Sequence, residues 1–133
     1  MTRFLHCILM CLLGGAASAQ DCVWLPAAML DRAIPELAPW HAYSVGQARC
    51  DFASERAVPR HFATVERVLH DSPEAARAAV RGMKGALSSL FTAEPVPTLG
   101  SAAFLGVTPI AGGELLSLTG HRDRLYVQLK LGF

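Results

Sequence analysis

The chain lacks the sequence patterns that mark the common catalytic sites. It has no Gly-x-Ser-x-Gly nucleophile elbow, and Gly112-Gly113 is not followed by the Lys-Ser/Thr of a phosphate-binding loop. No two histidines after residue 19 have the short His-x-x-x-His spacing of a zinc site. These histidines are His41, His61, His70 and His121. An enzyme therefore stays an alternative only if distant residues form its site in three dimensions.

Charge is sparse and long apolar runs are missing. The chain has 12 Lys and Arg against 11 Asp and Glu, without a basic run. A nearly neutral chain of this kind lacks the electrostatic footprint of a protein that binds nucleic acid or anionic lipid. The main apolar run, residues 4–13, is about half the ~20 residues that span a bilayer. We therefore expect no nucleic-acid partner and no stable membrane anchor.

The first nineteen residues have the three parts of a cleavable export signal. Arg3 supplies the positive charge, residues 4–13 are apolar, and Ala17-Ser18-Ala19 is a small-x-small cleavage site. Residues 1–19 are predicted to be a signal peptide, and residues 20–133 to form a single periplasmic or secreted domain. Loss of Arg3 leaves eleven basic and eleven acidic residues, so the mature domain is predicted to be neutral.

Only two cysteines, Cys22 and Cys50, follow residue 19. An exported chain with an even number of cysteines is expected to form a disulfide. The bridge would close a loop of about 29 residues and contribute roughly 3–4 kcal/mol in the chain-entropy treatment. A redox pair or metal thiolates are the alternative, but redox pairs usually lie closer in sequence. Cys22 follows Gln20-Asp21 rather than a small residue, so we expect no lipid on it.

Two segments are predicted to be helices. Leu25–Leu37 has Pro26 in its first turn, and Pro35 ends or distorts it. Pro73–Phe91 follows the N-cap Ser72 and repeats apolar residues at helical spacing. The residues predicted to form its core face are Ala76, Val80, Met83, Leu87, Leu90 and Phe91.

Five segments are predicted to be strands because of their alternating or β-branched residues. They are Tyr43–Phe52, His61–His70, Ala102–Val107, Glu114–Thr119 and Leu125–Leu131. Gly46 is expected at a bulge or bend, residues 39–41 and 94–98 in connections, and Cys50 on an inward face. The order α-β-β-α-β-β-β predicts an α+β domain: an antiparallel sheet of about five strands with two helices packed mainly on one face.

Two groups of residues are candidate binding sites. Trp40, His41 and Tyr43 combine large aromatic area with polar tips, which is typical of recognition surfaces, although Trp40 can equally be part of the core. Gly82 and Gly85 lie opposite the core face of the second helix. They either allow close approach of a partner's backbone or form a tolerated exposed face.

Four features resemble a group of small exported bacterial proteins that includes secreted lipoproteins and sensor-like extracellular domains. They are Cys22 before an apolar helix, the segment Arg49-Cys50-Asp51-Phe52, the long helix 73–91, and residues 99–104 before the last strands. The fold of this group is similar to that of the extrinsic PsbP protein of photosystem II. The resemblance implies a binding or accessory role without a shared catalytic residue. The chain departs from the lipoprotein members because it lacks a lipid-accepting cysteine.

These observations favour an exported, non-enzymatic domain without a cofactor. Its expected partner is another envelope protein or a small ligand. An inhibitor or immunity-type periplasmic protein is an alternative of the same class. The alternative of a different class is a small hydrolase or metal-dependent enzyme.

Overall fold

The computed structural model describes residues 21–56 and 61–133. The predicted signal peptide, residues 1–19, lies outside the described residues. The helices and 3-10 turns are α2 (Ala27–Ala33), η1 (Pro35–Leu37), α3 (Pro73–Leu87) and η2 (Pro97–Leu99). The strands are β1 (Trp40–Val45), β2 (Arg49–Ser54), β3 (Phe62–Leu69), β4 (Thr92–Pro95), β5 (Phe104–Ile110), β6 (Gly113–Arg122) and β7 (Leu125–Gly132). The α+β class is confirmed.

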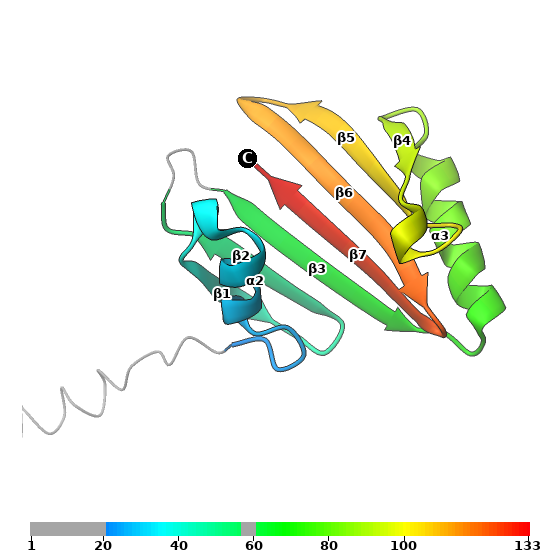
Figure 1. Cartoon of the computed structure of the whole chain (residues 1–133), viewed down its shortest axis with the longest axis horizontal. Helices are drawn as coiled ribbons and strands as arrows, with labels where there is room; N and C mark the ends of the chain where they lie inside the picture. Colours follow the sequence, from blue (N-terminus) through cyan, green and yellow to red (C-terminus); the bar gives the residue numbers. More distant parts are fainter. Residues whose placement is uncertain (1–20, 57–60) are drawn as a thin grey trace, which may run out of the picture.

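The strands form one antiparallel sheet in the order β1-β2-β3-β7-β6-β5-β4 (Figure 1). It has seven strands instead of about five. The segment 43–52 is a hairpin rather than one strand, because the backbone reverses where the Gly46 N–H donates to the Arg49 carbonyl at 2.8 Å. Residues 92–95, part of which was expected in a connection, pair with β5 as an edge strand.

The helices are shorter than predicted. The first is α-helical only over Ala27–Ala33, and Pro35 begins a separate 3-10 turn. In α3, Ser72 is the N-cap and accepts a hydrogen bond from the Ala75 N–H at 3.0 Å. The prediction that α3 continues to Phe91 is wrong, because the chain turns after Leu87. Phe91 then stacks on Phe104 with ring centroids 5.8 Å apart.

The helices lie on opposite faces of the sheet, which corrects the prediction that both pack mainly on one face. Residues around α2 form one core cluster: Cys22, Leu30, Trp40, Ala42, Cys50, Phe52, Ala63 and Val65. Val80 of α3 packs in a second cluster with Phe104 and Tyr126. Val127 packs against the first cluster, although it follows Tyr126 directly in β7. Successive strand residues point to opposite faces, so we call these faces the α2 face and the α3 face.

A disulfide joins Cys22 to Cys50, with the Cα atoms 6.2 Å apart, as predicted. Both cysteines are fully buried, and Cys50 lies on the α2 face of β2. The Asp21 carboxylate accepts hydrogen bonds from the N–H groups of Cys22 and Ala27. The bridge therefore fastens the segment that enters α2 to the sheet. Within residues 21–56 and 61–133, no helix has the length and apolar character needed to cross a membrane.

Candidate functional site

Each helix covers only part of its face of the sheet. Figure 1 shows α2 over β1 and β2 at one edge of the sheet, whereas α3 lies on the other face and packs against β6 and β7. Two rows of apolar side chains on the α2 face therefore continue across β7, β6 and β5 beyond α2. Cross-strand pairing defines the rows as Leu129–Leu118–Leu105 and Leu131–Leu116–Val107. All six are partly exposed. We call these six residues the open apolar face.

A trough lies at one end of this face, next to η2. It has a volume of about 210 Å³ and is lined by Leu99, Leu118, Gly120, Arg122, Val127 and Leu129, among others. Gly120 lets the segment around η2 pack closely on β6, because a Cβ there would lie 3.3 Å from the Ala103 Cβ and 3.7 Å from the Leu99 carbonyl oxygen. Leu99 belongs to η2 and is 49% exposed, so it forms an apolar wall. The trough is thus a mainly apolar depression, and Arg122 and His121 are the polar residues of its lining.

Two arginines without an ion pair flank β7 near this end of the sheet. Within the described residues, the ion pairs involve neither Arg122 nor Arg67. Arg67 pairs with Val127 across β3 and β7, and its guanidinium lies 4.6 Å from the Trp24 ring centroid. Its Nε donates to the Gln47 carbonyl at 2.9 Å. Arg67 is therefore held in place, whereas Arg122 is an exposed side chain at the end of β6.

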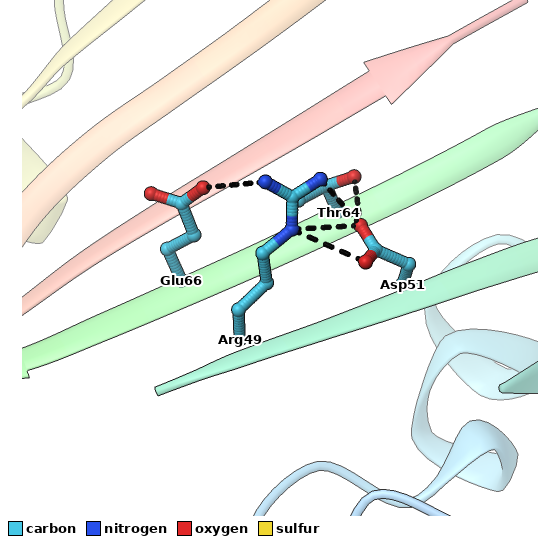
Figure 2. A network of polar contacts seen from close by, with 4 residues as sticks. All are labelled: Arg49, Asp51, Thr64 and Glu66. Carbon is cyan, nitrogen blue, oxygen red and sulfur yellow. Dashed lines mark hydrogen bonds and ion pairs between the residues drawn. The ribbon is translucent and has the colours of Figure 1, made fainter. Parts of the chain in front are cut away.

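The α3 face carries a polar network over β2 and β3 (Figure 2). Arg49 lies between two carboxylates, with 2.9 Å from its Nη2 to Asp51 Oδ1 and 3.3 Å from its Nη1 to Glu66 Oε1. Thr64 donates to Asp51 at 2.7 Å. Burial disfavours the charged form of Asp51, but the hydrogen bonds from Arg49 and Thr64 outweigh it and lower the pKa of this carboxyl. The network stabilises an ionised Asp51 and so fastens β2 to β3.

A buried polar group lies beside this network, towards α3. Gln128 is 1% exposed, and its Nε2 donates to the hydroxyls of Ser117 and Thr119 at 3.3 Å. The Gln128 Oε1 and the Tyr126 hydroxyl are buried without a partner within the described residues. Burial, together with the charge of Glu66, raises the pKa of Tyr126. A neutral phenol and an amide do not by themselves form a nucleophile or a general base.

The predicted aromatic patch is divided between the core and the surface. Trp40 is 4% exposed and belongs to the first core cluster, so it does not form a recognition surface. His41 and Tyr43 are more exposed, and His41 Nδ1 lies 3.6 Å from Glu55 Oε1. The three residues thus do not form one patch, because a buried and an exposed side chain alternate at the start of β1.

Gly82 and Gly85 lie on the exposed side of α3. A Cβ added at either position would meet no atom within 4 Å. No backbone of the described chain approaches this strip. Close approach of a partner's backbone and a tolerated exposed face both stay predictions for these glycines.

The described residues contain no group of three or more His, Cys, Asp or Glu side chains that could hold a metal ion. His61 packs edge-on against Phe133 and His70 against Tyr126. The His121 Nδ1 lies 3.1 Å from the Asp123 carbonyl oxygen. These three histidines therefore have local contacts on different elements. The arrangement gives no specific support to the metal-dependent alternative.

The sequence analysis did not predict the open apolar face, although the sequence contains an alternating pattern that indicates it. Leu105 and Val107 alternate with smaller or polar residues, as do Leu116 and Leu118 in the next strand. Two short helices cannot cover both faces of a sheet of this width. Comparing the apolar strand positions with the available helices would have indicated an uncovered face.

Comparisons with protein-family models, with curated proteins and with solved structures found no match. The resemblance to exported proteins with a PsbP-like fold therefore stays a prediction from the sequence.

Proposed function

We propose that this protein is an exported, non-enzymatic binding domain and that the open apolar face is its binding surface. One observation carries the proposal: two rows of apolar side chains run from the covered core into a part of the sheet that no helix of the described chain covers. Contiguous exposed apolar surface on a soluble domain is typical of interaction sites.

Side chains in one cross-strand row become more exposed with distance from α2, and this supports the open apolar face as the binding surface. Val65 and Leu129 are cross-strand neighbours on the α2 face. Val65 is 5% exposed, whereas Leu129, Leu118 and Leu105 are all partly exposed. Leu129 and Leu131 of β7 still pack against the first core cluster, so the rows leave the covered core in the step from β7 to β6. A ligand or partner that covers β5 to β7 would extend this core without rearranging the sheet.

The polar network is a weaker candidate. Arg49 directs its guanidinium at Asp51 and Glu66, and Thr64 adds a hydrogen bond to Asp51. These groups satisfy one another, so a ligand would have to break internal bonds to use them. The network is better explained as a clamp between β2 and β3.

Export is the other part of the proposal. The buried disulfide between Cys22 and Cys50 is consistent with an oxidising compartment, where disulfides persist. The predicted signal peptide over residues 1–19 indicates the same compartment. Both favour a ligand or partner of the cell envelope or the surrounding medium.

The test is a titration of oxidised, ¹⁵N-labelled protein (residues 20–133) with fractions of envelope extract. We expect shifts of amide signals from β5, β6 and β7. Leu118→Gln should remove these shifts, whereas the control Leu90→Gln should not, because Leu90 is exposed outside the open apolar face. Shifts confined to β1, β2 or α3, or no shift with any fraction, would contradict the proposal.

A further inference from the structure

We propose that the trough beside η2 binds the hydrocarbon chain of a single-chain anionic amphiphile, such as a fatty acid, and that Arg122 binds its anionic headgroup. This inference rests on the proposed binding function and names the ligand class of the same face. Its basis is the combination of an apolar floor, an apolar wall at Leu99 and an arginine without an ion pair at one end.

The size of the trough favours a small molecule. Its floor spans two strands and residues 118–122 of β6, which gives roughly 10 Å by 16 Å from ordinary strand dimensions. That area is on the order of 160 Å², against about 800 Å² per partner in a standard protein interface. A helix about 10–12 Å across would not enter a depression of this width. An extended hydrocarbon chain matches its length and its apolar lining.

The charge at the end of the trough favours an anion. Arg122 lines the trough itself. Arg67 lies on the other side of β7 and pairs with Val127, which also lines the trough. Asp123 is the nearest acidic residue in sequence, and it forms no ion pair with Arg122. A carboxylate at the mouth of the trough would accept charge-assisted hydrogen bonds from the Arg122 guanidinium.

This local charge is compatible with the nearly neutral composition. Net charge decides whether a domain is drawn to an extended anionic surface such as a membrane. A single headgroup requires only one or two positioned guanidinium groups. The proposed ligand is accordingly one dispersed molecule and not a lipid bilayer.

The test uses oxidised protein of residues 20–133 and calorimetric titration with sodium dodecanoate below its micellar concentration. We expect one molecule to bind per chain, with shifts of amide signals around Leu118, Gly120 and Val127. Dodecyltrimethylammonium has the same chain with the opposite charge and should bind at least about tenfold more weakly. Butanoate, which is too short to fill the trough, should not bind measurably.

Two variants with matched controls separate the contributions. Arg122→Gln should weaken dodecanoate binding about tenfold and should not weaken dodecyltrimethylammonium, whose charge Arg122 repels, while the control Arg81→Gln on exposed α3 should change neither. Leu118→Gln should weaken both amphiphiles, while Leu90→Gln should weaken neither. Circular dichroism and amide spectra establish that each variant is folded before titration. Equal binding of the two amphiphiles, or unchanged dodecanoate binding in Arg122→Gln, would overturn the inference.

The outcomes distinguish this inference from the proposed function. If dodecanoate does not bind but an envelope fraction shifts the signals of β5 to β7, the binding function stands and the amphiphile is wrong. If neither produces shifts, both proposals fail. If sedimentation shows a dimer that Leu118→Gln converts to a monomer, the occupant of the face is a second copy of the chain, and the amphiphile is again wrong.

Discussion

Tyr126 and Val127 are neighbours in β7, yet they pack in different hydrophobic clusters. Tyr126 lies with Val80 and Phe104 beneath α3, and Val127 packs against the cluster beneath α2. The central strand thus has an apolar side chain on each face, and the helices cover different parts of those faces. This offset leaves one part of the α2 face open and apolar, and it is the basis of the proposed binding surface.

Removal of the disulfide should destabilise the fold without altering the open apolar face. The double variant Cys22→Ala, Cys50→Ala lacks the cross-link that closes the loop, so its unfolded state gains entropy. We expect a loss of about 3–4 kcal/mol in the free energy of unfolding, measured by urea titration. Dithiothreitol should lower the stability of the parent protein and leave the variant unchanged. A variant with unchanged stability would show that the bridge does not constrain the chain.

Asp51→Asn should destabilise the protein at neutral pH. The change removes the charge that pairs with Arg49, and we expect a cost of about 1–3 kcal/mol. The pKa of Asp51 is lower in the folded state than its ordinary value of 3.8, so its stabilising contribution is complete above that value. The contribution is lost as pH falls through the folded-state pKa. The stability difference between parent and variant, measured by urea unfolding, should therefore be constant from pH 7 to pH 5 and shrink towards pH 2.

Glu66→Gln is the matched control for this prediction. Glu66 makes one contact with the same arginine and is more exposed, with 33% of its side chain accessible against 11% for Asp51. Its substitution should cost less than about 1 kcal/mol. An equal cost for both variants would contradict the assignment of Asp51 as the centre of the clamp.

Local sequence signals predicted much of the fold correctly. Alternation in β7 placed Val127, Leu129 and Leu131 on one face, and Ser72 marked the start of α3. These features depend on residues a few positions apart. The disulfide was predictable as well, because only two cysteines follow the predicted signal peptide.

Properties that depend on distant residues were not predictable in the same way. The helical spacing of Phe91 predicted that it belongs to the helix. In the structure Phe91 lies after the end of α3 and stacks on Phe104 of β5. Strand periodicity shows which residues of a strand share a face. It does not show which face each helix covers, because that depends on contacts between residues far apart in sequence. The open apolar face follows from this choice, so it became visible only in three dimensions.

Substitution of the α3 glycines should stabilise the isolated protein. A Cβ at Gly82 or Gly85 meets no atom within 4 Å, and alanine is the better helix former. We expect Gly82→Ala and Gly85→Ala to raise the free energy of unfolding by about 0.5–1 kcal/mol each. Gly106→Ala is the contrasting variant, because its Cβ would lie 2.5 Å from the Phe91 ring. It should lower stability by about 1–3 kcal/mol. Thermal unfolding of the three variants decides the matter, and a loss of stability in both helix variants would contradict the exposed placement of this strip.

One pair of identical substitutions tests whether the α2 face is covered at one end and open at the other. Val65 and Val107 both point to this face, but Val65 lies in the buried cluster beneath α2 and Val107 is partly exposed on β5. Threonine has nearly the same shape as valine and adds a hydroxyl, which costs free energy where water and hydrogen-bond partners are excluded. Val65→Thr should therefore reduce the free energy of unfolding by about 1–3 kcal/mol, and Val107→Thr by less than about 0.5 kcal/mol. Equal costs would mean that β5 is covered as thoroughly as β3, and the open apolar face would then not exist in solution.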